Sequence, residues 1–315
     1  MTTLMAREMA EAPEACARLL ENGALKDAAR EWRASDPAAL VTVARGSSDH
    51  ACAYVGYAAA QVAGVVWASY PPSLASLHGH TPRGAGMAAL AVSQSGGSPD
   101  IVAAAEALRD GGASVVALTN TPGSPLAEAI QRTVPLDAGA ERAVAATKSF
   151  VASVAAGLRL VALWTGDGAL ADATMRLPDA LSSAMAADMT ETIDVLSATD
   201  RLLVLGRGPA LGTAGEVALK AMELCEVPAL ALSGAEVRHG PMQAVKGGFP
   251  VIDLDRDAPL EGARVLPLPP RASLHPLVDP LLDVMPLYAA LEAATRARGL
   301  DPDAPSRLRK VTRTL

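Results

Sequence analysis

The chain has 315 residues, of which half are hydrophobic and only 3% aromatic, and it carries a formal net charge of −7 at pH 7. This length predicts two domains of ordinary size, and the negative charge argues against a nucleic-acid partner. The longest apolar stretch, residues 150–163, is interrupted by Arg159, so no membrane-spanning helix is predicted. An acidic N-terminus without the apolar segment of a signal peptide predicts a cytoplasmic protein. Three scattered cysteines fit no metal or disulfide spacing and are expected to be buried thiols.

Predicted strands and helices alternate after an N-terminal helical arm at residues 1–38. The apolar runs that indicate buried strands lie at residues 39–44, 65–70, 87–92, 114–119 and 133–136, and helices are expected at 49–62, 99–110 and up to about residue 165. Strands that alternate with helices predict a parallel sheet covered on both faces. We therefore expect a first α/β domain at residues 39–165, followed by a helical connector at 166–200.

The pattern starts again after this connector. Residues 202–208 resemble residues 40–46 at an offset of 162, and a predicted helix at 211–226 matches the one at 49–64. The period is far too long for a solenoid and indicates a duplicated domain at 201–275. The second copy has no serine-rich loop and little room for a helix between Pro259 and Pro270, so its sheet should be smaller. A C-terminal helix and tail at 276–315 complete a predicted α/β fold of two tandem doubly wound, flavodoxin-like domains.

A serine-rich loop separates a predicted strand from a predicted helix in the first domain. It reads Ser93-Gln94-Ser95-Gly96-Gly97-Ser98. A helix N-terminus offers unpaired N–H groups and a positive dipole end, which together bind phosphate. The serine hydroxyls can donate to phosphate oxygens, and the two glycines would let the backbone approach the ligand. An ordinary capped loop has the same composition, so these residues alone leave both interpretations open.

Charged residues with possible chemical roles are concentrated in the second half of the chain. Glu216, Lys220 and Glu223 share one face of the predicted helix, where they form either a solvated stripe of ion pairs or the wall of a cleft. His239 precedes a Gly-Pro pair and is expected in a loop, where it could titrate near neutral pH. Lysine is rare in this arginine-rich chain, which singles out Lys310, because lysine can form a Schiff base and arginine cannot. No set of histidines, cysteines and carboxylates has metal-site spacing, so no metal is predicted.

Five motifs occur in the order found in the sugar isomerase (SIS) domain family. They are Ser93–Gly96, Ala146–Phe150, the helix with Glu216 to Glu223, Arg238–Pro241 and the tail with Lys310. The chain resembles the isomerase half of glucosamine-6-phosphate synthase from Glu8 to Leu315. Within the family it looks most similar to stand-alone glucosamine-6-phosphate deaminases of the SIS type. The motifs shared with those deaminases are Arg45–His50, Ser98–Ile101, Ala145–Ser149 and the ending Lys310–Thr312.

The resemblance implies a role for each matching residue. Glu223 would carry a proton between C1 and C2, and His239 would open the sugar ring. Lys220 would stabilise charge near O1 or C1, and Lys310 corresponds to the Schiff-base lysine of the family. The residues implied in binding the phosphate, the hydroxyls or the sugar are Ser48, Ser93, Gln94, Ser95, Ser98, Val144 and Ala146.

The sequence departs from the synthase pattern at two positions near the sugar. Gly97 stands where the synthase has glutamate, and Ala146 stands where it has a serine that touches the sugar. The phosphate contacts are therefore better defined than the sugar contacts.

The implied reaction is the deamination of glucosamine 6-phosphate to fructose 6-phosphate and ammonia. Isomerisation gives an imine at C2, and water then releases ammonia without a metal or organic cofactor. The segment before the first predicted strand is too short for the glutaminase domain of a synthase, so we expect deamination rather than synthesis. The resemblance also implies a homodimer in which the loop with His239 enters the active site of the neighbouring subunit.

Other functions remain open at this point. They are an aminotransferase without a glutaminase, a deglycase for fructosamine 6-phosphate, and a non-catalytic phosphosugar sensor. The presence of Glu223, His239 and Lys310 favours an enzyme over a sensor, because a sensor requires none of them.

Overall fold

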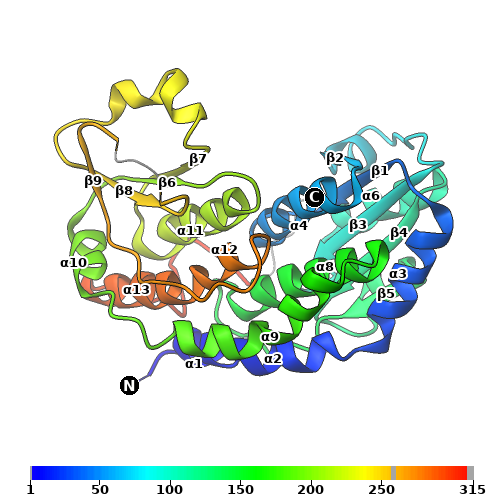
Figure 1. Cartoon of the computed structure of the whole chain (residues 1–315), viewed down its shortest axis with the longest axis horizontal. Helices are drawn as coiled ribbons and strands as arrows, with labels where there is room; N and C mark the ends of the chain where they lie inside the picture. The colour runs from blue at the N-terminus through cyan, green and yellow to red at the C-terminus, as the bar shows by residue number, and fades with distance from the viewer. Residues whose placement is uncertain (1, 257–259, 311–315) are drawn as a thin grey trace.

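Two parallel sheets lie at opposite sides of the molecule in the computed structural model, which describes residues 2–256 and 260–310 (Figure 1). The first sheet has the order β2-β1-β3-β4-β5 and the second the order β7-β6-β8-β9, with every neighbouring pair parallel. These sheets confirm the predicted α/β class and the smaller second sheet. Val311 and Thr312, part of one predicted motif, lie outside the described residues.

The first sheet is buried on both faces. Its strands are β1 (Ala39–Val43), β2 (Val66–Ser69), β3 (Met87–Ser93), β4 (Ser114–Thr119) and β5 (Arg132–Pro135). In β3, Leu90 joins the core formed with α3 (Gly23–Ser35), α4 (Ser47–Ala63) and α8 (Lys148–Thr165). Its neighbour Ala91 joins the core on the other face, formed with α6 (Pro99–Asp110) and the short helices α5 (Ser73–Ser76) and α7 (Pro125–Ala129). Burial of alternate residues on opposite faces explains the continuous apolar runs of these strands.

Helix α8 is the central helix of the hydrophobic core. By length and composition it could span a membrane, but 83% of it is buried and it packs against α3, α4, α2 (Ala12–Leu20) and α9 (Gly168–Ala184). Gly157 allows close contact with α4, because a Cβ atom there would lie 2.2 Å from Val55. Buried Lys148 at its first turn forms an ion pair with Glu11, which fixes the N-terminal arm to the domain.

The N-terminal arm and the connector are broken into several helices. The arm consists of α1 (Leu4–Ala10), α2 and α3, and the connector consists of α9 and α10 (Thr190–Ala198). Asn22 lies between α2 and α3 and caps α3 by accepting a hydrogen bond from the N–H of Ala24. The three cysteines are free and buried, as predicted.

The second domain repeats the first in strand order and register. Its elements are β6 (Leu202–Leu205), α11 (Ala210–Cys225), β7 (Ala229–Leu232), β8 (Phe249–Asp253) and β9 (Ala263–Val265). Thr42 pairs with Leu90 in the first sheet, and Val204 pairs with Ile252 in the second, at the predicted offset of 162. Helices α11, α10, α12 (Asp279–Leu282) and α13 (Val284–Ala297) cover one face of this sheet. Among the described residues, the other face has only the 3-10 helices η1 (Glu236–His239) and η2 (Pro241–Ala244).

The equivalent helices α4 and α11 cross at the centre of the molecule (Figure 1). Their contact depends on two glycines of α11, because a Cβ at Gly212 would lie 2.7 Å from the His50 carbonyl and one at Gly215 would lie 2.4 Å from the His50 ring. This close crossing brings the charged face of α11 to the first turn of α4. It therefore joins residues of both domains in one site.

Candidate active site

A pocket of about 380 Å³ lies at the carboxyl end of the first sheet. The adjacent strands β1 and β3 lead to helices on opposite faces, and such a switch in direction is where open α/β sheets bind ligands. The pocket is lined by the loops after both strands, the loop before α8, the last turns of α11 and the tail. It brings together ten of the eleven predicted site residues: Ser48, Ser93, Gln94, Ser95, Ser98, Val144, Ala146, Lys220, Glu223 and Lys310.

The serine loop is shaped by its own hydrogen bonds. The N–H of Gly96 donates to Ser93 Oγ at 3.1 Å, and the N–H of Gly97 donates to Ser95 Oγ at 3.3 Å. Both hydroxyl groups keep their own hydrogens to donate to a ligand. Ser98 begins α6 without capping it, so its side chain is also available.

The expected role of Gly96 in admitting the ligand is wrong. Gly96 has a φ of +60°, and a Cβ there would lie 2.1 Å from Ser124 Oγ, so the glycine serves the turn and its packing against α7. Gly97 differs, because the nearest atom to a Cβ at that position is Ser95 Oγ at 3.8 Å. The position where the synthase has glutamate is therefore open.

An ion pair joins the two loops that form the cradle. Arg45, which follows β1 and lines the pocket, donates to the Asp100 carboxylate from Nε at 3.0 Å and lies 2.9 Å from it through its terminal nitrogen. Asp100 is buried in the first turn of α6. The pair fixes the spacing of the loops and places the guanidinium of Arg45, whose charge Asp100 balances, at the pocket.

Lys220 is the centre of a buried polar cluster on α11. Its Nζ lies 2.6 Å from Glu223, 2.9 Å from Ser47 Oγ and 3.4 Å from Glu216. Tyr288 donates a hydrogen bond of 2.7 Å to Glu216. Glu216 and Lys220 are fully buried, while the Glu223 side chain is 23% exposed. The charged face of α11 is therefore the wall of a cleft and not a solvated stripe.

Electrostatics keep Lys220 charged in this cluster. Burial alone would lower the pKa of Lys220, but the charges of Glu216 and Glu223 and their hydrogen bonds raise it above the usual value. Burial raises the pKa of Glu216 to about 7 although Lys220 and Tyr288 act in the opposite direction. Burial, and then the charge of Lys220, lower the pKa of His50 to about 4, so this histidine is neutral at pH 7. Lys220 is thus the fixed positive charge beside Glu223.

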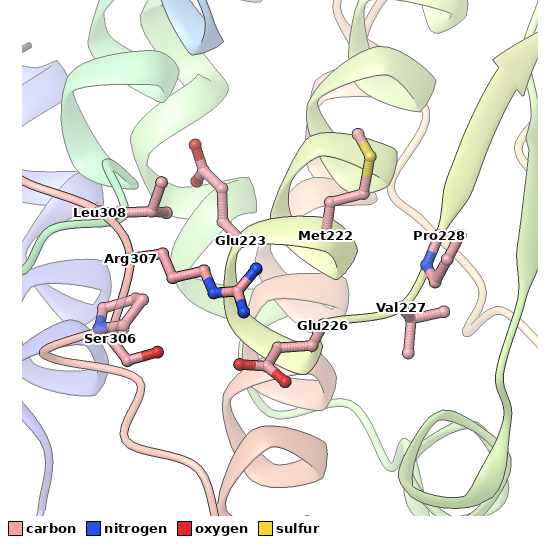
Figure 2. Close-up of a pocket in the computed structure, with 9 residues that line it drawn as sticks. Met222, Glu223, Glu226, Val227, Pro228, Ser306, Arg307 and Leu308 are labelled. Carbon is pink, nitrogen blue, oxygen red and sulfur yellow. The ribbon is translucent and has the colours of Figure 1, made fainter.

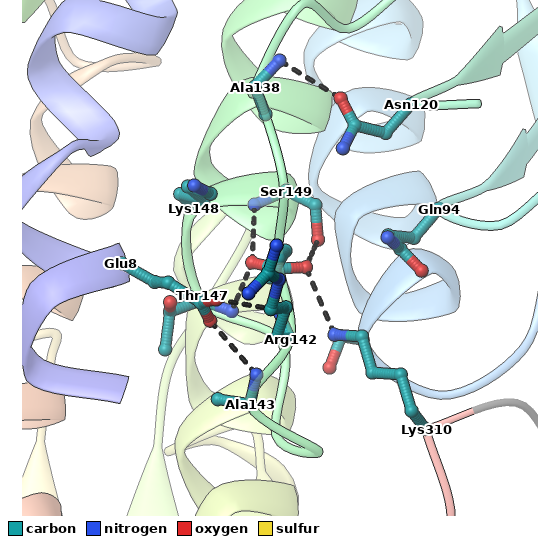
Figure 3. A network of polar contacts seen from close by, with 12 residues as sticks. Glu8, Gln94, Asn120, Ala138, Arg142, Ala143, Thr147, Lys148, Ser149 and Lys310 are labelled. Carbon is teal, nitrogen blue, oxygen red and sulfur yellow. Dashed lines mark hydrogen bonds and ion pairs between the residues drawn. The ribbon is translucent and has the colours of Figure 1, made fainter. Parts of the chain in front are cut away.

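The tail with Lys310 is held by a buried carboxylate that the sequence analysis did not single out (Figure 3). Lys310 Nζ lies 3.4 Å from Glu141, which also accepts hydrogen bonds from the N–H groups of Thr147 and Ser149 and from Ser149 Oγ, at 2.6 to 3.1 Å. Burial raises the pKa of Glu141, but Lys310 and these hydrogen bonds outweigh it and the net shift is downward. Glu141 is therefore an ionised anchor for the tail.

The loop that carries Val144 and Ala146 is also held from the N-terminal helix. Glu8 accepts hydrogen bonds from the N–H groups of Arg142 and Ala143 at 2.5 and 3.1 Å (Figure 3). Asp303 of the tail accepts from the N–H groups at the start of α1. This side of the pocket thus depends on both ends of the described chain.

His239 is the one predicted site residue that does not line the pocket. It is the last residue of η1, and its side chain is exposed. Helix η1 belongs to the yellow segment of Figure 1, which lies on the far side of the second sheet from α4. A role in this pocket of the same chain is therefore not supported.

The comparisons with known proteins agree with this fold. The SIS domain model matches residues 35–163. A candidate phosphosugar isomerase from Silicibacter pomeroyi is 41% identical, with a TM-score of 0.88 over 96% of this chain and 100% of that chain. The C-terminal domain of glucosamine-fructose-6-phosphate aminotransferase from Francisella tularensis shares the fold, with a TM-score of 0.80 over 96% of this chain and 98% of that domain at 20% identity.

Among the curated proteins, the relatives are glutamine–fructose-6-phosphate aminotransferases (isomerizing). The enzyme from Aeropyrum pernix is 32% identical over 97% of this chain and 56% of its own length. The enzyme from Symbiobacterium thermophilum is 31% identical over 70% of this chain and 43% of its own length. The chain thus spans about half the length of the curated relatives that it matches. Together with the whole-length match to the Silicibacter pomeroyi protein, these similarities show that the chain belongs to the SIS domain family.

Proposed function

We propose that the chain is an amino-sugar phosphate deaminase that converts glucosamine 6-phosphate and water into fructose 6-phosphate and ammonia. The observation that carries this proposal is a single pocket in which a hydroxyl-rich cradle faces the Lys220–Glu223 pair and a second lysine, Lys310. The names of the curated relatives, which specify an isomerising reaction of fructose 6-phosphate, support a phosphorylated sugar as the ligand.

The phosphate would bind where α4 and α6 begin. Gly46 precedes α4 and has no side chain to cap it. Ser98 precedes α6 and does not cap it with its side chain. The helix dipoles favour an anion at this position, and Ser48, Ser93 and Ser95 supply hydroxyl donors around it. The other end of the sugar, with C1 and C2, would then face Glu223.

Glu223 would act as the base that moves the proton. In the open-chain substrate it takes the proton from C2 and returns it to C1, while a proton passes from the amine nitrogen to O1, which leaves an imine at C2. The ammonium of Lys220, 2.6 Å from this carboxylate, would stabilise negative charge that develops on O1. Water adds to the imine carbon, the C–N bond breaks, and ammonia leaves as fructose 6-phosphate forms.

We assign the hydrolytic direction because it needs only substrate and water. Synthesis in the opposite direction requires neutral ammonia as the nucleophile, and at neutral pH most ammonia is protonated. Lys310 lines the same pocket as Glu223 and would hold the open-chain sugar, either by its charge or as a Schiff base.

Ring opening would be performed by His239 of a second copy in a homodimer. His239 is exposed and lies away from the pocket of its own chain, so it can reach a ligand only in another subunit. The exposed apolar side chain of Leu230 on edge strand β7, near the loop with His239, supports a contact with a second copy.

The test is to incubate the purified chain with glucosamine 6-phosphate and to measure ammonia and fructose 6-phosphate. We expect both products in equal amounts, and no glucosamine 6-phosphate when glutamine and fructose 6-phosphate are supplied instead. Binding of the substrate without turnover would identify a sensor. Turnover of fructosamine 6-phosphate alone would identify a deglycase.

A further inference from the structure

Cavities outside the phosphosugar pocket differ in how they relate to it. One of about 640 Å³ shares Glu223 and Leu308 with that pocket and therefore belongs to the proposed active site (Figure 2). A smaller pocket of about 200 Å³ lies in the second domain. None of the described residues that line this smaller pocket also lines the phosphosugar pocket, so the proposed reaction does not use it.

The smaller pocket has the same place in the second sheet that the phosphosugar pocket has in the first. It lies at the carboxyl ends of β6 and β8, and its walls are the loops after these strands and the segment that leads into η1. From β6 the chain continues to β7 on one side of the sheet, and from β8 it continues to β9 on the other. Such a switch in direction is where open parallel sheets bind ligands.

The loops of this pocket have diverged from their counterparts in the first domain to different extents. After β6, Gly208 has a φ of +57°, and the equivalent Gly46 after β1 has a φ of +55°, so the turn is kept. After β8 the chemistry has changed, because Asp255 stands where the first domain has Ser93, at the same offset of 162. A carboxylate thus replaces a hydroxyl that would donate to phosphate.

Two carboxylates follow β8 into this pocket. Asp255 accepts a hydrogen bond of 2.7 Å from the N–H of Arg207, and its own N–H donates to the buried carboxylate of Asp253 at 3.1 Å. A Cβ at Gly234 would lie 3.4 Å from Asp255 Oδ2, so this carboxylate faces the segment that leads into η1. The two negative charges repel a phosphate and favour an ammonium group at this end of the pocket.

Two arginines bring the opposite charge to the same pocket. Arg207 follows β6, Arg238 belongs to η1, and both side chains are exposed. In the described part of the chain neither of them forms an ion pair, whereas Arg45, the equivalent of Arg207, is paired with Asp100. Their guanidinium groups can therefore bind a carboxylate of a ligand.

The volume and the apolar walls limit the size of this ligand. The pocket has about 200 Å³, roughly half of the 380 Å³ of the phosphosugar pocket. Leu205 and Leu260 also line it. These walls suit a short aliphatic group between an ammonium and a carboxylate.

We propose that the pocket binds a small aliphatic α-amino acid. The ammonium of the ligand would pair with Asp253 and Asp255, and its carboxylate would pair with Arg207 and Arg238. A bound amino acid would join the segment after β8 to η1 and so hold the loop that carries His239. The binding is independent of the proposed function, and only its link to ring opening through His239 rests on it.

Three probes with one carbon skeleton test whether both charges are recognised. L-Valine has both charges, isovalerate lacks the ammonium, and isobutylamine lacks the carboxylate. In calorimetric titrations of the full chain we expect valine to bind at least about tenfold more tightly than either of the others, because each of them loses charge-assisted hydrogen bonds. No binding of valine, or equally tight binding of isovalerate or isobutylamine, would overturn the proposal.

Substitutions on opposite walls locate the ligand. Arg238→Gln should weaken valine at least about tenfold by removing a carboxylate contact, and Asp255→Asn should do the same at the ammonium while its amide oxygen still accepts from Arg207. Arg264→Gln, at an exposed arginine of β9, is the matched control and should leave valine binding unchanged. Wild-type affinity in both pocket variants, or an equal loss in Arg264→Gln, would overturn the proposal.

Hydrogen exchange tests the link to the loop with His239. Valine should slow amide exchange in residues 234–239 and leave residues 99–110 of α6 unchanged, and equal exchange in 234–239 with and without valine would overturn this link. Valine binding and sugar turnover are measured separately. Turnover of glucosamine 6-phosphate without valine binding would refute only this inference, and valine binding without turnover would refute only the proposed function.

Discussion

The ammonium of Lys310 lies 3.4 Å from the fully buried carboxylate of Glu141, 169 positions earlier in the chain. This contact ties the tail to the loop with Val144 and Ala146, which lines the pocket. Because Glu141 also accepts three hydrogen bonds from Thr147 and Ser149, a change at Glu141 should affect the loop and the tail together.

Glu141→Gln should lower both activity and stability. The amide keeps the shape but removes the negative charge and sets its NH₂ group against N–H donors, so the free energy of unfolding should fall by about 1–3 kcal/mol. Without its anchor, Lys310 should be less well placed, and kcat should fall more than KM rises. Denaturant unfolding and steady-state kinetics measure both effects. Glu128→Gln, at an exposed glutamate of α7, is the control, and an equal effect there would contradict the account.

Lys310→Arg separates charge from nucleophilicity. Arginine keeps the ion pair with Glu141 but cannot form a Schiff base. If Lys310 forms one, borohydride should trap a substrate adduct on the wild-type chain and none on Lys310→Arg, and turnover should be lost in this variant and in Lys310→Ala. Mass spectrometry of the trapped protein gives the answer. Full activity in Lys310→Arg would show that only the charge is needed.

The raised pKa of Glu216 predicts a dependence of stability on pH. Its pKa is about 7 in the folded chain and about 4.5 in the unfolded chain, so the folded state holds the proton more tightly between these values. The contribution of Glu216 to stability is therefore fully present below pH 4.5 and is lost as pH rises through 7. Glu216→Gln should remove this loss, so its stability relative to wild type should increase from pH 4.5 to 7. Urea unfolding at several pH values measures it, and a constant difference would contradict the shift.

Much of the fold follows from the sequence because its signals are local. Continuous apolar runs marked β3 and β4, which are buried on both faces, and the offset of 162 revealed the second domain. The short helices α5 and α7 were missed, since four or five residues carry no periodicity. The single predicted arm is three helices, because its breaks depend on capping at Asn22 and on packing against α8.

The candidate site was predictable where its residues lie in loops at the ends of strands. Parallel strands bring those loops to one edge, which is why Ser48 and Ser95 line the same pocket. Glu141 could not be assigned a role, because its partner Lys310 is 169 positions away and only the folded tail joins them. The role of Gly96 was misread for a similar reason, since Ser124, which fills the space beside it, lies later in the chain as the N-cap of α7.

A shared active site can be tested by mixing inactive chains. His239→Ala and Glu223→Gln should each abolish turnover, for lack of ring opening and of proton transfer respectively. If His239 acts in the site of the neighbouring subunit, each hybrid dimer should contain one intact site. It should then recover up to half of the activity of a wild-type dimer. Purified hybrids with two different tags provide the measurement. No recovery in verified hybrids would place both residues in one chain's site or exclude His239 from the reaction.

The transfer of the C2 proton is the step that tests the account most directly. Glucosamine 6-phosphate that carries deuterium at C2 should react more slowly than the unlabelled substrate and give fructose 6-phosphate with part of the label at C1, as seen by NMR. One ammonia should appear for each fructose 6-phosphate. Glu223→Gln should bind the substrate but lose at least 10²-fold in turnover, a typical contribution of a general base. Unlabelled product at full speed, or normal turnover in Glu223→Gln, would contradict the proposed mechanism.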